Sequence, residues 1–326
     1  MKAALHSMGM TGARRVAAIF AALACVGAGG GGIETVVSGT AHQALFAVAF
    51  AGEQGLAVGA AGQVLATSDG GRTWQKQLKP VTTRALLGVA MAGDRAIAVG
   101  QSGTVLVRGV DGQWSLVASG TEERLLAVDV DPQGVAVAVG GFGKILLSRD
   151  GGSSWTSIAP SWMDGGYTDQ GLEPHLYAVD LAADGSITCA GEFGLILRSV
   201  DAGQSWAVLA RGTDSLFSLE LRDDGMGYAV GQGGTILRTT DRGATWSEVA
   251  STSESNLLGV ASSADGRVVV TAMRDMLVSD DGLAWRRVSG GDFALAWYTG
   301  VATRGSGASA AALVVGHSGR IVRIDL

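Results

Sequence analysis

One motif recurs along nearly the whole chain and limits the folds that are open to it. An apolar pair followed by a short alternating run marks the start of each unit. The starts are separated by 41, 39, 51, 40, 41 and 40 residues, at Leu45, Leu86, Leu125, Leu176, Leu216, Leu257 and Trp297. A period near 40 residues is the signature of a propeller blade. The sequence therefore predicts an all-β fold, a seven-bladed β-propeller of four-stranded antiparallel blades.

Each unit contains four short apolar runs, which we expect to form strands a to d. Strand a is the alternating run, as in 125–130, and strand b ends in Ala-Val-Gly in several units. Strand c is apolar and β-branched, as in 235–239, and a Trp opens strand d. Turns rich in Gly and Asp, which tolerate tight backbone geometry, separate such strands. We expect the b–c turns and the d–a connections to share one face of the ring.

The c–d loop is the most specific motif, reading Thr/Ser-x-Asp-x-Gly-x-Thr/Ser-Trp. Four full copies contain Asp69 and Trp74, Asp150 and Trp155, Asp201 and Trp206, and Asp241 and Trp246. Degenerate copies end at Trp114 and Trp285. This pattern is the Asp-box, or BNR repeat. We expect the carboxylate to accept N–H bonds across the turn and the Trp to pack between blades. We interpret these aspartates as structural and not as catalytic acids.

The two ends of the repeat region complement each other. The seventh unit stops after strand c at Leu326, whereas residues 33–40 align with 206–213 as an isolated strand d. We therefore predict that the N-terminal strand completes the last blade, which removes the exposed edge of an open array. Residues 33–326 are then a single propeller.

The N-terminal region is typical of a targeting signal. Lys2, Arg14 and Arg15 precede an apolar run at 16–26, which is short for a membrane-spanning helix. We predict a signal peptide at 1–24, cleaved near Ala24, and a Gly-rich spacer at 25–32. The mature protein would be exported to the periplasm, or to the thylakoid lumen in a phototroph. A lipid anchor at Cys25 is an alternative to a free soluble protein.

Composition excludes several classes of function. The net charge of −6 argues against nucleic-acid binding, which needs a basic footprint. Two Cys and four His leave little material for a metal site, and no phosphate-binding loop is present. We predict no metal, no cofactor and no nucleic-acid partner. Cys189 lies in an alternating segment and is expected to be a small buried residue.

The single long spacing inserts residues 160–175 between the third and fourth units. This insertion should lie on the face of the b–c turns. Aromatic and acidic side chains on such a loop are typical of a site that binds a partner. The alternative is a loop that only covers the mouth of the channel. Our candidate partner-binding residues on this face are Trp162, Tyr167, Asp164, Glu173, His175, Phe142, Phe193, Glu192, Arg274 and His317.

A carbohydrate-active propeller, either a sialidase-like glycoside hydrolase or a lectin, is the alternative function. Trp162 and Tyr167 would then form a sugar platform. Carboxylates for hydrolysis could come from Asp164, Asp169, Glu173 and Glu192, but their spacing singles out no pair. We therefore predict a non-enzymatic protein with no catalytic residue.

The compound unit resembles that of the photosystem II stability and assembly factors. The resemblance rests on Ala-Val-Gly-x-x-Gly followed by Ile-Leu-x-Thr/Ser-x-Asp-x-Gly-x-Thr/Ser-Trp, as in 228–246, and it covers about 33–326. It implies a non-enzymatic seven-bladed scaffold that holds a membrane-protein precursor during assembly.

The family is associated with an arginine-rich patch on one face, and this sequence departs from that pattern. Ten acids and five bases occur on the corresponding loops: Glu122, Glu123, Asp164, Asp169, Glu173, Glu192, Asp214, Glu254, Asp275 and Asp292 against Lys79, Arg84, Arg124, Arg211 and Arg274. An acidic face repels the partner that an arginine patch attracts. We therefore predict a bacterial relative outside photosynthesis, a monomer that binds a subunit of another envelope complex.

Overall fold

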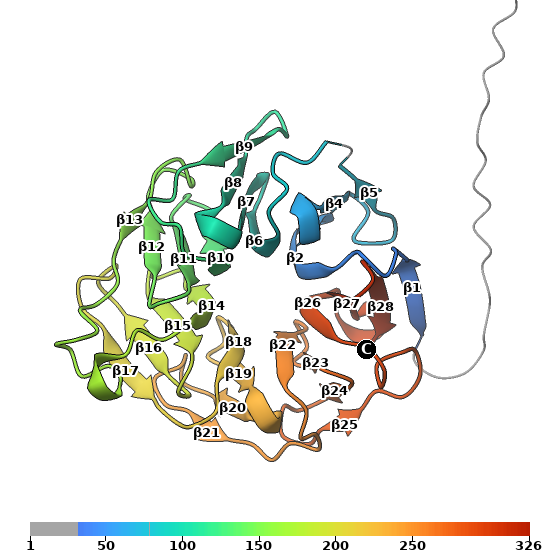
Figure 1. Ribbon diagram of the computed structural model, residues 1–326. Helices are drawn as coiled ribbons and strands as arrows, with labels where there is room; N and C mark the ends of the chain where they lie inside the picture. The colour runs from blue at the N-terminus through green and yellow to red at the C-terminus, as the bar shows by residue number, and fades with distance from the viewer. Residues whose placement is uncertain (1–31, 78) are drawn as a thin grey trace, which may run out of the picture. The chain divides into compact units, whose positions relative to one another are not determined.

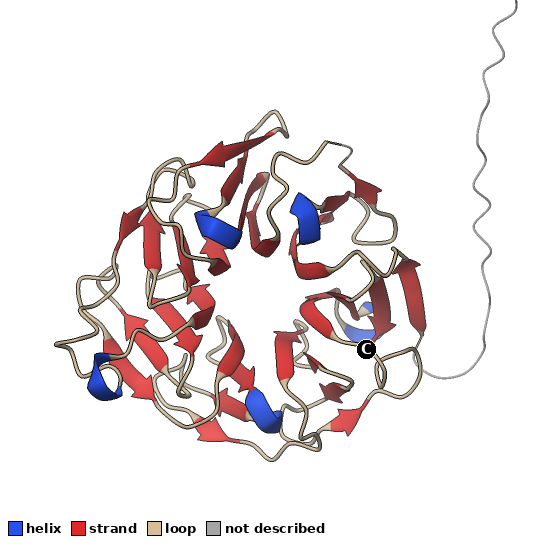
Figure 2. Ribbon diagram, in the orientation of Figure 1, coloured by secondary structure: helices blue, strands red, loops and turns tan. Residues whose placement is uncertain are grey.

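The computed structural model describes residues 32–77 and 79–326, and they form seven four-stranded antiparallel sheets arranged around a central opening (Figure 1). The predicted seven-bladed β-propeller is confirmed. The signal peptide predicted at 1–24 and nearly all of the spacer at 25–32 lie outside the described residues. Strands and loops dominate the ring, with five 3-10 turns between them (Figure 2). In the described residues no helix has the length and apolarity needed to span a membrane.

The strand bounds follow the repeat, with the order a-b-c-d in blades one to six. Blade one contains β2 (Leu45–Ala51), β3 (Gln54–Gly59), β4 (Val64–Thr67) and β5 (Gln75–Lys76). Blade two contains β6 (Leu86–Ala92), β7 (Arg95–Gly100), β8 (Val105–Arg108) and β9 (Trp114–Val117). Blade three contains β10 (Leu125–Val130), β11 (Ala136–Gly140), β12 (Ile145–Ser148) and β13 (Thr156–Ser157). Blade four contains β14 (Leu176–Leu181), β15 (Ile187–Gly191), β16 (Ile196–Ser199) and β17 (Ala207–Ala210).

The remaining blades repeat this pattern. Blade five contains β18 (Leu216–Leu221), β19 (Gly227–Gly231), β20 (Ile236–Thr239) and β21 (Ser247–Glu248). Blade six contains β22 (Leu257–Ser262), β23 (Val268–Ala272), β24 (Met276–Ser279) and β25 (Arg286–Arg287). Blade seven contains β26 (Tyr298–Arg304), β27 (Ala311–Gly316), β28 (Ile321–Asp325) and β1 (Ile33–Val37). The 3-10 turns are η1 (Ala60–Gly62), η2 (Gln101–Gly103), η3 (Asp169–Gly171), η4 (Gln232–Gly234) and η5 (Gly307–Ser309).

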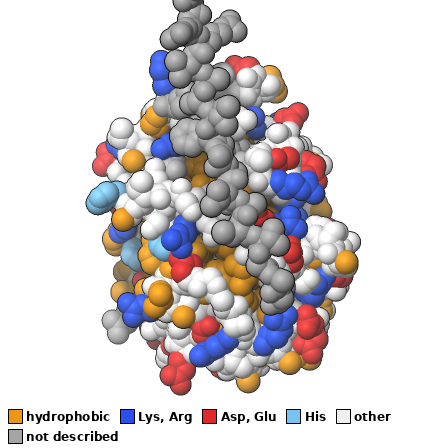
Figure 3. Space-filling view, turned by 90° about the vertical axis from the view of Figure 1, so that its right-hand side faces the viewer, with side chains coloured by type: hydrophobic (Ala, Val, Ile, Leu, Met, Phe, Trp, Pro, Cys, Tyr) orange, Lys and Arg blue, Asp and Glu red, His pale blue; other side chains and the backbone are white. Residues whose placement is uncertain are grey.

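The first strand closes the ring, as predicted. β1 pairs antiparallel with β28, with Ile33 opposite Ile324 and Glu34 opposite Arg323. Ile33 packs against the core between blades six and seven, and Val37 packs against the core between blades seven and one. On the side of the molecule that Figure 3 shows, the visible acidic and basic side chains are interspersed and form no basic stripe.

One detail of the repeat differs from its sequence-based alignment. Tyr298, and not Trp297, starts the seventh strand a, because Tyr298 pairs with Gly316 as Leu45 pairs with Gly59. Tyr298 is fully buried, whereas Trp297 is partly exposed and stacks on Phe46 of blade one, with ring centroids 6.1 Å apart.

The core consists of apolar layers between consecutive blades. One layer joins Val137 and Val139 of β11 to Ile187 and Cys189 of β15. The prediction that Cys189 is a small buried residue is confirmed, and burial raises the pKa of its thiol far above its usual range. A thiol in this environment is unreactive.

Three carboxylates bridge the inner strands of successive blades. Asp129 accepts the N–H of Leu181 at 2.8 Å, and Asp180 accepts the N–H of Leu221 at 3.2 Å. In the same way, Glu220 accepts the N–H of Ser262 at 3.0 Å and its hydroxyl at 2.7 Å. The inner strand is an edge of each sheet, so its channel-facing N–H groups need partners from outside the sheet. The equivalent residues in the other inner strands are alanines: Ala49, Ala90, Ala261 and Ala302.

Sequence reasoning did not identify these bridges. The available signal was an acid at the same position of strand a in three consecutive units, 129, 180 and 220. Burial, followed by the charge of Asp129, raises the pKa of Asp180 to about 7. Burial also raises the pKa values of Asp129 and Glu220.

Removing β1 should destabilise the ring. A chain that starts at Ser38 uncovers the edge of β28 and the apolar surfaces on which Ile33 and Val37 pack. We expect a loss of about 2 kcal/mol or more, which corresponds to two half-buried aliphatic side chains and their ladder bonds. Thermal unfolding compared with a chain that starts at Gly32 measures this effect. Equal melting temperatures would show that β1 does not close the fold.

Asp180→Asn should stabilise the protein at alkaline pH. The pKa of Asp180 is raised in the folded protein, so folding favours the protonated carboxyl. The wild type therefore loses stability as the pH rises from the unfolded pKa of 3.8 through about 7. Asn is neutral and keeps an oxygen for the Leu221 N–H. Denaturant unfolding should show a gain that is small at about pH 4 and much larger at about pH 8. Asp94→Asn, which removes an exposed carboxylate elsewhere, is the matched control. An equal gain at both pH values contradicts this account.

Candidate functional site

The aspartates of the c–d turns are occupied by local hydrogen bonds. In the turn of blade five, Asp241 accepts the N–H of Thr245 at 2.9 Å and its hydroxyl at 2.6 Å. Thr239 donates its hydroxyl to Asp241 at 2.7 Å and accepts the N–H of Gly243 at 3.0 Å. The turns of Asp69, Asp150 and Asp201 repeat these bonds. We call these four loops the aspartate turns.

The tryptophans of these turns pack between blades, as expected. Trp74, Trp155, Trp206 and Trp246 each contact an apolar layer. The indole N–H of Trp206 donates to the carbonyl of Ile158 in the preceding blade, at 3.0 Å. The other three donate within their own turns, to Gly71, Gly152 and Gly243.

Hydrogen bonding lowers the pKa values of the four aspartates. For Asp241 the bonds from the Thr245 hydroxyl and N–H lower the pKa to about 2, and Asp150 and Asp201 behave in the same way. The Thr73 hydroxyl has the same effect on Asp69. A general acid needs a pKa near the working pH. These carboxylates are therefore suited to holding turns, not to proton transfer.

The insertion lies on the face of the b–c turns, as expected. Its carbonyl at Pro174 accepts the N–H of Gly143, at 2.7 Å, in the b–c turn of blade three. Ser161 donates its hydroxyl to Asp164 at 2.7 Å, and Thr168 donates its hydroxyl to the carbonyl of Leu172 at 2.5 Å. These bonds hold residues 161–174 as a defined loop over blades three and four.

Trp162 is buried, which corrects its predicted role as a contact residue. Only 5% of the residue is exposed, because it packs into the apolar layer between blades three and four. Its indole N–H donates to the carbonyl of Gly143 at 3.2 Å, and its ring meets Tyr167 edge to face at 5.9 Å. Trp162 therefore anchors the insertion and cannot act as a sugar platform in this arrangement.

Two neighbouring b–c turns present phenylalanines in the left-handed backbone region. The third residue of every b–c turn has positive φ; the seven are Ala61, Ser102, Phe142, Phe193, Gly233, Arg274 and Ser318. Left-handed backbone costs a residue that has a Cβ about 1–2 kcal/mol, and glycine is the usual residue there because it avoids this cost. Phe142 and Phe193 are nevertheless 50% and 42% exposed. Bulky apolar side chains held in this way on a surface are functional-site candidates.

The two phenylalanines border the insertion, which contributes further exposed apolar side chains. Met163 is 77% exposed and Leu172 is 50% exposed. Phe142 also meets His175 edge to face at 4.9 Å. We call the insertion, the b–c turns of blades three and four and residues 211–213 the insertion surface.

Glu192 and the backbone of His175 are bonded to each other on this surface. Glu192 accepts the N–H of His175 at 2.8 Å, directly before strand β14. Gln101 and Gln232 occupy the same turn position in their blades and accept the equivalent N–H groups of Ala85 and Ser215. Glu192 therefore makes the structural bond that Gln makes in other blades, which makes it a poor candidate for a catalytic acid.

Two predicted site residues lie elsewhere on this face. Arg274 belongs to the b–c turn of blade six, and His317 belongs to that of blade seven. The Nε2 of His317 lies 2.8 Å from a carboxylate oxygen of Asp292, which also accepts from Arg320. The structure thus gathers Trp162, Tyr167, Asp164, Glu173, His175, Phe142, Phe193 and Glu192 around the insertion and separates them from Arg274 and His317. Within the described residues no three His, Cys, Asp or Glu side chains are placed to share a metal ion.

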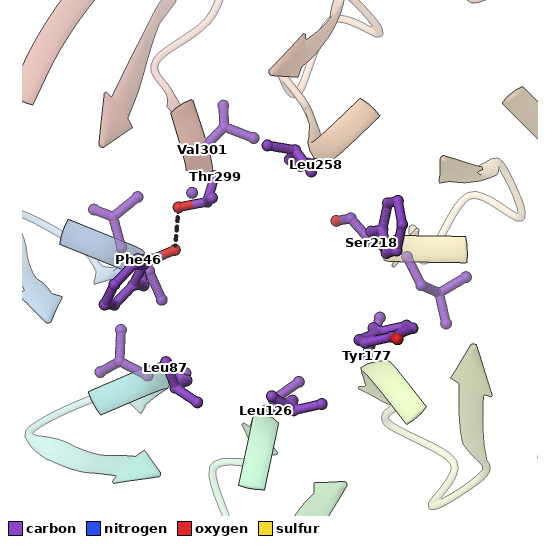
Figure 4. Close-up of a pocket in the computed structure, with 18 of the residues that line it drawn as sticks. Phe46, Leu87, Leu126, Tyr177, Ser218, Leu258, Thr299 and Val301 are labelled. Atoms are coloured by element: carbon purple, nitrogen blue, oxygen red, sulfur yellow. Dashed lines mark hydrogen bonds between the residues drawn. The ribbon is translucent and has the colours of Figure 1, made fainter. Parts of the chain in front are cut away.

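A central cavity of about 420 Å³ lies among the inner strands of the ring. Its mouth is surrounded by the second residues of the inner strands, and Figure 4 shows Phe46, Leu87, Leu126, Tyr177, Leu258 and Thr299 around the opening. The third residues are Gly, Ala or Ser, and at Gly88, Gly259 and Gly300 a Cβ would lie within 3.0 Å of the backbone of the next inner strand. Close packing of the inner strands therefore sets the width of the cavity.

A second cavity of about 420 Å³ lies between the insertion and blade four. It is lined chiefly by Tyr167, Asp169, Leu172, Phe193, Leu195 and Arg211. The N–H of Gly212 donates to the carbonyl of Phe193 at 2.8 Å, so the wall formed by blade four is tied together. We call this cavity the insertion pocket. The candidate binding residues chosen from the sequence included Tyr167 and Phe193 but not Leu172, Leu195 or Arg211, which lie in three separate segments.

Solved structures of other propellers resemble the ring. YCF48 bound to D1 peptide superposes with a TM-score of 0.69 at 16% identity, covering 90% of this chain and 96% of that chain. YCF48 from Cyanidioschyzon merolae gives 0.71 at 22% identity, covering 90% and 98%. A GH74 xyloglucanase from Xanthomonas campestris gives 0.70 at 18% identity, covering 91% of this chain but 54% of the enzyme. No protein-family model and no curated sequence matches the chain. At these identities the likeness shows a shared fold.

Asp241→Asn should destabilise the protein at neutral pH but not near pH 2. Because the folded pKa is lowered, ionised Asp241 stabilises the fold above the unfolded value of 3.8, and this contribution is lost as the pH falls through about 2. Melting temperatures from about pH 7 down to about pH 2 should therefore converge for wild type and variant. Asp94→Asn should follow the wild type throughout. A difference that persists at the lowest pH would show that the carboxylate charge is not responsible.

Proposed function

We propose that this protein is an exported, non-enzymatic scaffold that binds a protein partner through the insertion surface. The observation that carries the proposal is the pair of half-exposed phenylalanines held at positive φ in neighbouring turns, Phe142 and Phe193. Exposed aromatic side chains in a rigid setting are typical anchors of protein interfaces. The b–c turns of the other blades meet the same backbone requirement mostly with small residues.

Three further points support this proposal. The compound repeat resembles that of assembly factors that hold membrane-protein precursors. A solved structure with this fold, that of YCF48, has a bound D1 peptide. Two candidate acids on the insertion surface are already bonded within the protein, which favours a non-enzymatic role. Glu192 accepts a backbone N–H, and Asp164 accepts the hydroxyl of Ser161. We infer that the partner is a subunit of a membrane or envelope complex outside photosynthesis, because the acidic loops depart from the arginine-rich pattern.

Replacing both phenylalanines by glycine tests the proposal without damaging the fold. Glycine removes the strain of positive φ, which offsets its larger loss of backbone entropy on folding, so Phe142→Gly/Phe193→Gly should keep a stability close to that of the wild type. The immobilised variant should lose the partner that the wild type retains from a detergent extract of the source membranes. Ser102→Gly makes the same backbone change in blade two and should retain the partner.

A glycan arm distinguishes the carbohydrate-active alternative. The wild type is also incubated with xyloglucan and with sialylated oligosaccharides, and both binding and released sugar are measured. Retention of the same proteins by the double variant would overturn the proposed surface. Sugar release, or specific glycan binding in the absence of a protein partner, would overturn the proposed function.

A further inference from the structure

We propose that the insertion pocket binds an apolar side chain within a basic segment of the partner. The inference rests on the proposed function and adds the chemistry of the segment that is recognised. Two observations carry it: the pocket is walled by apolar side chains and held by internal bonds, and its edge carries exposed carboxylates.

The pocket is built to accept an apolar group. Leu195 forms part of its lining and is 1% exposed, whereas Leu172 and Phe193 are about half exposed at its sides. Tyr167 contributes an aromatic wall, and its ring meets the ring of Trp162 edge to face. A volume of about 420 Å³ lies within the usual range of sites that bury a ligand group. The exposed apolar side chains therefore lose water only when such a group enters.

The pocket walls are already held in place. The insertion side is fixed by the bond from Thr168 to Leu172 and by the buried anchor Trp162. On the opposite side, a Cβ at Gly194 would lie 2.6 Å from the nitrogen of Gly212, so Gly194 lets the turn and the connection pack closely. A preformed pocket loses less ordering entropy on binding than a flexible loop.

The charges at the edge select a basic segment. Asp169 lines the pocket, Glu173 follows Leu172, and both are exposed with no hydrogen bond to their carboxylates within the described residues. Asp164 is also exposed on the same loop. Among the lining residues Arg211 carries the opposite charge, and its guanidinium donates to the carbonyl of Gly166. Acidic side chains around an apolar pocket attract Lys and Arg that flank an apolar anchor and repel acidic segments.

Synthetic peptides test the inference with the full chain. The probe is a short fluorescent peptide with a central Phe flanked on both sides by Lys, and fluorescence anisotropy measures its affinity. Replacing Phe by Ser, or all Lys by Glu, should weaken binding about tenfold or more. Raising the salt from about 0.05 M to about 0.5 M should weaken only the charge-dependent part.

Variants of the protein assign the peptide to this pocket. Asp169→Asn/Glu173→Gln should weaken the basic peptide about fivefold, the effect of losing two exposed ion pairs. Phe193→Gly should remove the preference for Phe over Ser. Glu122→Gln/Glu254→Gln removes two exposed acids from other connections on the same face and should leave affinity unchanged.

The outcomes separate this inference from the proposed function. If Phe142→Gly/Phe193→Gly abolishes partner retention but the Lys and Glu peptides bind equally, the basic-segment inference is wrong and the scaffold function stands. Stronger binding of the Glu peptide would also overturn it. Concentration-dependent dimers that disappear in Phe193→Gly would show that a second copy of the chain occupies the pocket, and would overturn it as well.

Discussion

Each blade can bury its apolar faces only against its two neighbours, and the fold therefore depends on closing the ring. Apolar layers such as the one joining Val139 to Ile187 recur at every blade junction. β1 supplies the last strand and contacts two of these layers, so it closes the array at both the backbone and the core. The closed ring of blades leaves only short sheet edges, which limits aggregation.

Polar groups within the ring are satisfied by two different devices. In the aspartate turns the bonds are local, since their hydroxyls and carboxylates accept backbone N–H groups two to four residues away. The carboxylates of the inner strands bond over long sequence separations, since Asp129 accepts the N–H of a residue 52 positions later. The first device is repeated in four turns, whereas the second occurs in blades three to five. The ring is therefore chemically asymmetric although its backbone repeats.

The insertion surface is where the chain departs most from its repeat. The long connection, two phenylalanines at a position usually given to small residues, and the carboxylates of the loop occur around the same two blades. The surrounding repeat makes these departures interpretable, since equivalent turns show what the backbone alone requires. The same comparison shows that Glu192 is not a departure from the repeat. Gln101 and Gln232 make the equivalent bond in their own blades.

The sequence by itself determined the blade number, the closing strand and the chemistry of the aspartate turns, because these depend on spacing and on bonds between near neighbours. It also located the insertion and two of its exposed aromatic residues. Only the tertiary structure decided that Trp162 is an anchor, that Glu192 holds a backbone N–H, and that Leu172, Leu195 and Arg211 share one pocket. Burial and pocket formation depend on how segments from different blades pack together, and a one-dimensional pattern does not specify that packing.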